Sequence, residues 1–444
     1  MKKKTFRAVA WLLTAAMGIL FAAGSTAQSI SAEAASSATI QSVKSISEIF
    51  GDGLKVTNVV VEYDKAIDPS SLSTATYEVE GRTVIAVHTN SEVAKTDVDV
   101  EGNYVVIELE VQSAILQDSD ASDGRAQNDT FDDGASVVQK KNVKALDGTV
   151  YKASSETFTT GSASGIMGND NTIHLIMDDF EDNHFYTDPE WKLVLHYNLY
   201  TPEGYETAEG ETYPLVLFIP DAGAVSSDWE TVLQQGKGGT VWASEEWQAE
   251  NPCFVVTMIY DDKIINDYWE YYENYIQSTI NLIYALAEEY PVDTNRIYTT
   301  GQSMGAMASF IMMELDPDLF AAAYCIAGQW DCNELVSIKD QNILMLASED
   351  DDAIDNINNI AVAWEASGKD VATAYIGVSD SDEVLTATMN ELLTQDTNLF
   401  YCKIRSGDGS LDIDGNSLKG SHRMTWRLGY DLPGVKEWLF AQSK

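Results

Sequence analysis

A predicted strand, a sharp turn and a predicted helix follow one another within residues 296–315, and this succession constrains the fold more than any other feature of the chain. The run Arg296–Thr300 is rich in β-branched and aromatic residues, as strands are. The turn Gly301–Gly305 has the sequence GQSMG, and a helix is predicted from Ser303 to Leu315. A G-x-S-x-G turn between a strand and a helix is typical of a nucleophile elbow, in which the turn exposes a serine hydroxyl. The pattern therefore predicts an α/β fold with Ser303 as a nucleophile.

Strands and helices alternate through residues 166–444, which favours a mostly parallel sheet with helices on both faces. The expected strands are 193–199, 214–220, 253–259, 296–300, 321–327, 342–347 and 399–404. The expected helices are 272–289, 303–315, 357–366 and 434–441. We therefore expect residues 166–444 to form one α/β hydrolase domain, preceded by a different kind of domain.

Short β-like segments, broken by polar turns, occupy residues 36–163. They include 56–63, 76–79 and 104–109, which are rich in β-branched and aromatic residues. Because no long helical period interrupts them, the sequence predicts an all-β sandwich of the immunoglobulin-like type. The polar stretch 117–136 predicts a surface loop, and 159–165 predicts a linker.

The chain begins with a predicted targeting signal. Four positively charged residues among the first seven precede the apolar run Ala8–Ala23. Small residues then offer cleavage sites after Ala27 or after Ala34. Since the apolar run is too short for a stable membrane anchor, we assign residues 1–34 to a signal peptide. The expected location is secreted and extracellular, with no membrane partner.

The composition is strongly acidic. Asp and Glu number 70 against 27 Lys and Arg, and the formal net charge is −43. Such a surface repels phosphate backbones and anionic lipids, so we expect no nucleic-acid partner. The four cysteines, at positions 253, 325, 332 and 402, lack the C-x-x-C spacing of a zinc or redox site. Three of them lie in or beside apolar runs, which favours buried thiols over two disulfides.

A serine hydroxyl is a weak nucleophile unless a base takes its proton. In an α/β hydrolase the acid and then the histidine follow the serine along the chain. His422 is the one histidine of five that lies beyond Ser303, and it falls in a polar segment that predicts a loop. The acid is expected after strand 342–347, where Asp350, Asp351 and Asp352 are all candidates. Its carboxylate would orient the imidazole and stabilise the imidazolium.

Two backbone N–H groups are expected to bind the oxyanion of the reaction intermediate. One belongs to the residue after the nucleophile, Met304, and the other to a loop after an earlier strand. That loop is Pro220–Gly223, and Ala222 is the expected donor. For the substrate pocket, Trp330 and Trp269 are candidates, because both fall in segments that follow strands.

The sequence around these residues resembles secreted esterases related to polyhydroxybutyrate depolymerases and feruloyl esterases. The resemblance lies in Tyr290–Gly305, in Pro317–Ala323, around His422 with Trp426, and in Glu437–Phe440. Such hydrolases commonly read Gly-Glu-x-Asp at the acid, and residues 348–351 (SEDD) align with that pattern. The resemblance therefore implies Asp351 as the triad acid.

Two positions depart from the resemblance. Pro220 and Asp221 replace the usual His-Gly of the oxyanion loop, and Ala306 replaces a glycine often found after Met304-Gly305. In the N-terminal region, Glu62–Ile67 resembles esterases that carry an immunoglobulin-like domain before the hydrolase. The resemblance implies hydrolysis of carboxylic esters with neither a metal ion nor an organic cofactor.

The leading hypothesis is a serine carboxylesterase that acts through an acyl-enzyme on small-molecule or polysaccharide-linked esters. One alternative is a serine peptidase similar to the prolyl oligopeptidases, and another is an inactive binding protein on a hydrolase fold. The N-terminal domain is expected to have a structural or partner-positioning role, including contacts in an oligomer. The stretch 408–416 has the alternating oxygen side chains of a calcium loop, but its spacing does not fit an EF-hand, so no metal site is predicted.

Overall fold

The N-terminal domain of the described chain is all β, and an α/β domain follows it. The computed structural model describes residues 40–111, 134–160, 171–225, 229–407 and 421–444. The expected signal peptide, most of the loop at 117–136, most of the linker at 159–165 and the stretch 408–416 lie outside these ranges. Ala38–Lys444 is one compact unit.

The described part of the N-terminal domain is built from strands of two to eleven residues and one 3-10 turn, Pro69–Ser71 (η1). Its strands are β1 (Ile40–Phe50), β2 (Gly53–Tyr63), β3 (Tyr77–Val79), β4 (Val84–Asn90), β5 (Tyr104–Leu109), β6 (Ser136–Gln139), β7 (Val143–Lys144), β8 (Val150–Tyr151) and β9 (Thr157–Thr159). One sheet has the order β10-β1-β2-β5-β4, and a second has the order β3-β6-β9. β10 (Thr172–His174) pairs in parallel with β1, so this sheet takes a strand from beyond the expected linker.

The core of this domain lies between its sheets. Alternate residues of β2, namely Val59, Val61 and Tyr63, are buried in it. The Tyr63 hydroxyl contacts the Tyr77 hydroxyl at 2.8 Å and donates to Gln139 Oε1 at 2.9 Å, which satisfies the buried phenol. Burial raises the pKa of the Tyr63 phenol.

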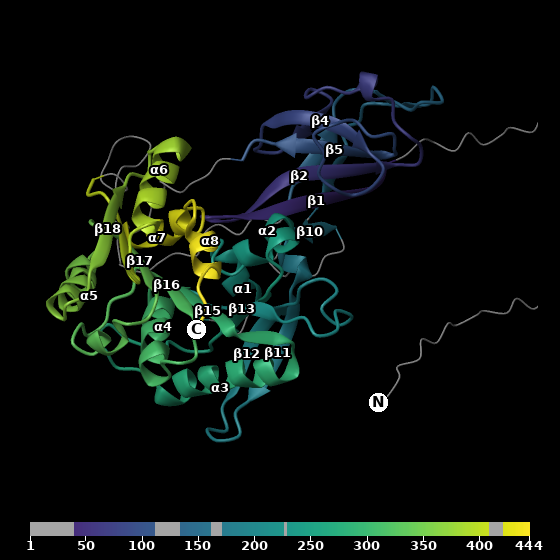
Figure 1. The fold of residues 1–444 in the computed structure, drawn as a ribbon. Coiled ribbons are helices and arrows are strands. Elements are labelled where there is room, and N and C mark those ends of the chain that lie inside the picture. The colour runs from purple at the N-terminus through teal and green to yellow at the C-terminus, as the bar shows by residue number, and fades with distance from the viewer. Residues whose placement is uncertain (1–39, 112–133, 161–170, 226–228, 408–420) are drawn as a thin grey trace, which may run out of the picture. The chain divides into compact units, whose positions relative to one another are not determined.

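The second domain is an α/β sheet of nine strands in the order β11-β12-β14-β13-β15-β16-β17-β19-β18 (Figure 1). The strands are β11 (Glu181–Thr187), β12 (Val194–Tyr200), β13 (Tyr213–Ile219), β14 (Phe254–Ile259), β15 (Val292–Gln302), β16 (Ala322–Ile326), β17 (Ile343–Ser348), β18 (Val371–Ile376) and β19 (Leu399–Ile404). β11 and β12 run antiparallel to their neighbours, and the other pairings are parallel. The predicted fold class, an α/β hydrolase sheet after an all-β domain, is confirmed.

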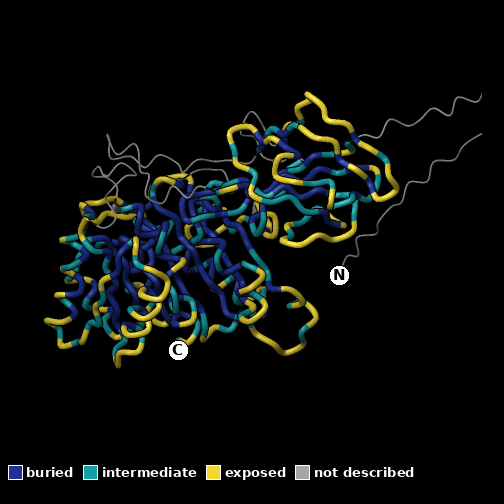
Figure 2. Tube along the Cα trace, turned by 90° about the horizontal axis from the view of Figure 1, so that it is seen from above, coloured by how far each residue is buried: buried dark blue, intermediate teal, exposed yellow. Residues whose placement is uncertain are grey.

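The helices of this domain cover both faces of the sheet. They are α1 (Trp229–Gln234), α2 (Glu245–Glu250), α3 (Glu273–Glu289), α4 (Met304–Leu315), α5 (Ile354–Ala366), α6 (Asp382–Leu393), α7 (Ser421–Gly429) and α8 (Val435–Phe440), with 3-10 turns η2 (Met177–Asp179), η3 (Val241–Ala243) and η4 (Leu335–Ile338). Along β13, Leu215, Leu217 and Ile219 belong to the same apolar core as buried residues of α3, α4 and α5. Val216 and Phe218 belong to another core, which includes buried residues of α1, α2, α6 and α8. Side chains of a strand alternate between faces, so each face of β13 has its own core. Figure 2 shows the buried residues gathered in the interior and the exposed residues in the outer loops.

All seven predicted strands are present, but β11 and β18 were not predicted. Both lie at the edges of the sheet, where one side of the strand meets solvent. Their sequences, EDNHFYT and VATAYI, accordingly lack the continuous apolar run of a buried parallel strand.

The hairpin between β1 and β2 contacts the hydrolase domain. Ile49 and Leu54, which flank its tip, belong to the same apolar core as Phe218 and Trp242. At the tip, a Cβ added to Gly51 would lie 1.9 Å from the backbone oxygen of Arg427 in α7. The N-terminal domain therefore packs directly on the last part of the hydrolase domain.

Two further findings concern the whole described chain. The four cysteines are unpaired thiols, and those at 253, 325 and 402 are buried. Burial raises the pKa of the Cys253 and Cys402 thiols to about 12, so they remain protonated. No helix within the described ranges is both long enough and apolar enough to cross a lipid bilayer.

Candidate active site

Ser303 lies at a sharp turn between β15 and α4. Its backbone has φ 52° and ψ −114°, a conformation that residues other than glycine rarely adopt. Its N–H donates to Ile326 O at the end of β16, at 2.8 Å, which ties the turn to the neighbouring strand. Strained backbone of this kind persists where the surrounding structure enforces it, and it is common at functional sites.

The two glycines of the elbow allow a close approach to the neighbouring strand β13 and within the turn itself. A Cβ added to Gly305 would lie 1.9 Å from Ile219 O, and one added to Gly301 would lie 2.5 Å from the carbonyl carbon of Gly305. No real side chain fits at such distances, so both positions require glycine. The elbow thus sits directly on the end of β13, where the loop at 220–224 begins.

The departure at Ala306 is accommodated by another glycine. A Cβ added to Gly328, just after β16, would lie 2.5 Å from the Ala306 Cβ. The methyl group of Ala306 therefore occupies space that Gly328 leaves free. The elbow keeps its shape with alanine at this position.

His422 faces Ser303. Its Nε2 lies 2.9 Å from Ser303 Oγ, and its Nδ1 lies 2.5 Å from Asp351 Oδ2. The prediction that His422 lies in a loop is wrong, because it belongs to the first turn of helix α7. Burial of Trp426, one turn later, fixes this short helix against the sheet, and the Trp426 ring packs edge-on against the imidazole with centroids 5.1 Å apart. Such packing is not visible in a nine-residue polar segment.

Asp351 is the carboxylate that reaches His422. It lies in the turn after β17, is 4 % exposed, and its Oδ1 accepts a hydrogen bond from Ala353 N at 2.9 Å. Of the other two candidates, Asp350 accepts hydrogen bonds from the Ser406–Gly407 turn, and Asp352 is exposed. The structure therefore brings together Ser303, His422 and Asp351.

The electrostatics favour a charged imidazole. Burial lowers the pKa of His422, whereas the hydrogen bond and the negative charge of Asp351 raise it. The charges of Asp221 and Asp267 add to this, so the net pKa of His422 is raised above its ordinary value. A histidine held in this way can accept a proton from Ser303 and keep it while a negative charge develops on a bound ester.

The two expected oxyanion donors lie next to the elbow. Met304 begins helix α4, so its N–H has no partner inside the helix and lies in the positive end of the helix dipole. Ala222 lies in the turn after β13, next to the buried Asp221. The sequence shows Asp221 as a departure but does not predict its partner Gln235, which lies directly after α1.

The two predicted pocket residues differ in exposure. Trp330 is 2 % exposed, and its Nε1 donates to Glu334 Oε2 at 2.9 Å. Trp269 is 42 % exposed and has a positive φ of 64°. Their segments meet, because the Trp330 ring packs against the Tyr271 ring with centroids 6.1 Å apart.

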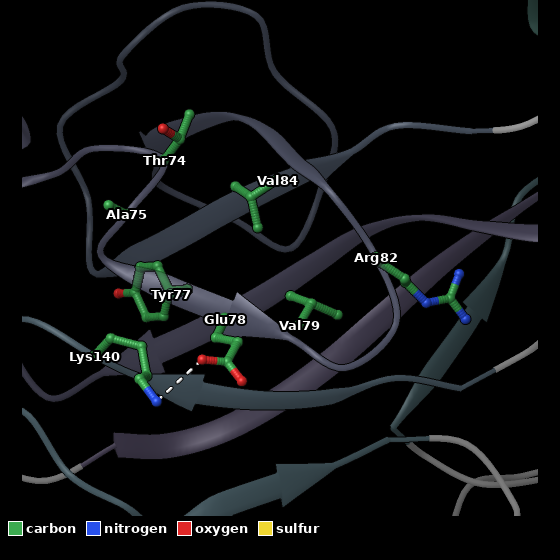
Figure 3. Close-up of a pocket in the computed structure, with 8 residues that line it drawn as sticks. All are labelled: Thr74, Ala75, Tyr77, Glu78, Val79, Arg82, Val84 and Lys140. Carbon is green, nitrogen blue, oxygen red and sulfur yellow. Dashed lines mark ion pairs between the residues drawn. The ribbon is translucent and has the colours of Figure 1, made fainter.

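A separate surface pocket lies on the N-terminal domain (Figure 3). Its volume is about 380 Å³, and it is lined by Thr74, Ala75, Tyr77, Glu78, Val79, Arg82, Val84 and Lys140. Glu78 and Lys140 form an exposed ion pair across it. None of the predicted site residues lines this pocket. Among the described residues, no group of three His, Cys, Asp or Glu side chains is arranged to hold a metal ion.

Comparisons with known proteins agree with the fold of the two domains. Residues 42–152 match the family model described as the esterase Ig-like N-terminal domain, and residues 255–374 match that of the prolyl oligopeptidase family. The crystal structure of a thermostable esterase is 25 % identical, with a TM-score of 0.70, and the match covers 91 % of this chain and 100 % of that one. These matches support a serine hydrolase of the esterase type. Its N-terminal domain is immunoglobulin-like, as predicted.

More distant structures also align with this chain. A ferulic acid esterase is 13 % identical with a TM-score of 0.39, covering 59 % of this chain and 99 % of that one. A feruloyl esterase module from Clostridium thermocellum is 14 % identical with a TM-score of 0.35, covering 56 % and 87 %. The comparison with curated proteins found no match to the sequence of this chain.

Proposed function

We propose that this esterase is an extracellular carboxylesterase that hydrolyses its substrate through an acyl-enzyme on Ser303. The observation that carries the proposal is the continuous hydrogen-bond chain from Asp351 through His422 to Ser303. A serine, a base and an orienting acid in this geometry are the parts that covalent acyl transfer requires. The basic and apolar N-terminal segment supports export from the cell.

In the acylation step, Ser303 Oγ attacks the ester carbonyl carbon while His422 Nε2 takes the hydroxyl proton. The carbonyl oxygen becomes an oxyanion, and the N–H groups of Met304 and Ala222 bind it. When the intermediate collapses, the bond from carbon to the alcohol oxygen breaks. His422 gives its proton to the leaving alcohol, and the acyl group stays on Ser303.

Deacylation repeats these steps with water. His422 takes a proton from a water molecule, and the resulting nucleophile attacks the acyl carbon. The second intermediate collapses with cleavage of the bond to Ser303 Oγ, which recovers the proton from His422. Asp351 holds the imidazole in one tautomer and stabilises its charged form throughout.

We place the substrate among small-molecule or polysaccharide-linked esters. Trp269 and Tyr271 are exposed and offer apolar surface to such a substrate. Asp267, in the same segment as Trp269, accepts a hydrogen bond from Gln329 Nε2 at 3.1 Å. Gln329 follows β16, whose Ile326 O accepts from Ser303 N. The strongly negative chain disfavours anionic polymers as substrates.

A second candidate function is peptide hydrolysis, which the prolyl oligopeptidase match at 255–374 favours. The two functions separate in one experiment. Wild type and Ser303→Ala are assayed on p-nitrophenyl acetate and butyrate, methyl ferulate and peptide p-nitroanilides. Ester turnover that disappears in the variant, with no amide turnover, supports the carboxylesterase. Amide turnover with a higher kcat/KM than any ester would replace it with the peptidase.

A further inference from the structure

A chain of three buried polar side chains joins the elbow to the loop after β13. Gln302 Nε2 donates to Gln235 Oε1 at 3.0 Å, and Gln235 Nε2 donates to Asp221 Oδ1 at 2.5 Å. The three residues are 1 %, 9 % and 3 % exposed, respectively. Burying such groups costs free energy unless they are hydrogen-bonded, so these bonds hold the three segments in one arrangement.

Asp221 also determines the shape of its own loop. Its Oδ1 accepts hydrogen bonds from Gly223 N at 2.5 Å and from Ala224 N at 3.1 Å. A side-chain oxygen that accepts from the second and third residues ahead mimics a backbone turn. The Asp221 carboxylate therefore accepts from the N–H groups of Gly223 and Ala224 but not from that of Ala222.

The loop is anchored to the elbow at two points. The backbone of Ile219 touches Gly305 directly, and the Gln235 side chain bridges to Gln302, the residue before Ser303. Oxyanion donors act only when they point at the place where charge develops, within about half an ångström. A loop tied to the elbow at two points meets that requirement better than a loop fixed by its backbone alone.

We propose that Asp221, Gln235 and Gln302 are positioning residues that hold the Ala222 N–H in the oxyanion hole beside the Met304 N–H. The inference rests on the proposed function, since an oxyanion hole matters only if Ser303 attacks an acyl group. It explains the departure at Asp221. The carboxylate replaces the usual residue because it folds the loop through its own hydrogen bonds.

The chain offers a matched control, Asp188, in the connection between β11 and β12. Its Oδ1 accepts hydrogen bonds from Glu190 N at 2.7 Å and Trp191 N at 2.8 Å, and its Oδ2 accepts from Asn281 Nδ2 at 2.8 Å. Asp188 is completely buried, like Asp221, and folds its loop in the same way. It lies beside the edge strand β11 rather than beside the elbow. The two residues share a structural role and differ in location.

The experiment measures kcat, KM and the thermal unfolding midpoint for the full chain with p-nitrophenyl butyrate. Asp221→Ala is expected to lower kcat by about 10²–10³, as loss of one oxyanion donor does, with KM changed only a few-fold. Asp221→Asn keeps the acceptor oxygen and is expected to restore most of kcat. Asp188→Ala is expected to lower the unfolding midpoint while kcat stays at the wild-type value.

A fourth variant keeps the proposal testable where Asp221→Ala fails to fold. Gln235→Ala leaves the turn at Asp221 intact and removes only its link to the elbow, so kcat is expected to fall about tenfold, equivalent to one lost hydrogen bond. If Asp221→Ala and Gln235→Ala both keep the wild-type kcat, or if Asp188→Ala lowers kcat as much as they do, the positioning role is wrong. If Ser303→Ala retains turnover, the proposed function itself fails, and that outcome is distinct from the other two.

Discussion

The two sides of Ser303 are built in different ways. On one side, His422 and Asp351 form the base and its orienting acid, and each is a single side chain with a defined chemical role. On the other side, the proposed oxyanion donors are backbone N–H groups, and buried side chains such as Asp221 shape the backbone that carries them. Chemistry that resides in side chains leaves a mark in the sequence. A site made of backbone N–H groups can be predicted only through the residues that fold that backbone.

The largest effect is expected on the base side. Asp351→Asn keeps the shape of the side chain but presents an amide to His422 Nδ1, which favours the wrong tautomer. We expect kcat for p-nitrophenyl butyrate to fall by about 10⁴. Asp352→Asn, an exposed neighbour, is the control and should leave kcat unchanged. Equal losses in both variants would mean that the loop, rather than Asp351, supports the histidine.

Gly305→Ala tests the oxyanion side without touching any side chain of the triad. The added methyl group would meet Ile219 O at 1.9 Å, so β13 and the loop after it must move. We expect kcat to fall by about 10²–10³ through loss of alignment. Ala306→Gly, one residue later, adds no atoms and should retain kcat. A fully active Gly305→Ala would show that close approach of β13 is not needed.

Gly51→Val tests whether the N-terminal domain supports both sides of Ser303. The tip of the β1–β2 hairpin touches Arg427 in the helix of His422, and a Cβ added to Gly236, next to Gln235, would lie 3.0 Å from Gly51 O. Overpacking of this contact is expected to lower the free energy of unfolding by about 1–3 kcal/mol. The measurement is denaturant unfolding, together with kcat. Glu92→Val, at an exposed position of the same domain, serves as the control.

The smallest expected effect is on the pH profile. The neutral imidazole is the active base, so kcat/KM falls as pH drops through the pKa of His422. Because that pKa is raised, the acidic limb should lie above pH 6.5, the ordinary value for histidine. Asp221→Asn and Asp267→Asn each remove one negative charge that raises the pKa, and each should move the limb to lower pH. An unmoved limb in both variants would contradict this electrostatic account.

Much of the fold could be predicted from the sequence, because buried parallel strands such as 342–347 are continuous apolar runs between recognisable turns. The elbow was predictable for the same reason, as its glycines mark backbone that must approach closely. The edge strand β18 and the helix that carries His422 were not predictable. Their stability comes from neighbours in space, such as the packing of Trp426, rather than from local pattern.

For the site, chain order was sufficient to single out His422 and to narrow the acid to three neighbouring carboxylates. The geometry then separates Asp351 from Asp350 and Asp352 by burial and partners. The link from Gln302 through Gln235 to Asp221 was out of reach, because these residues lie 67 and 14 positions apart. Only the folded chain brings such partners together.

The most direct test of the central claim is to find the acyl group on Ser303. Wild type is mixed with a p-nitrophenyl ester, quenched in acid within the first turnover, digested and mapped by mass spectrometry. The account predicts an acylated peptide that contains Ser303, together with a burst of one p-nitrophenol per active enzyme. Ser303→Ala should show neither. Full turnover by Ser303→Ala, or an acyl group on another residue, would contradict the account.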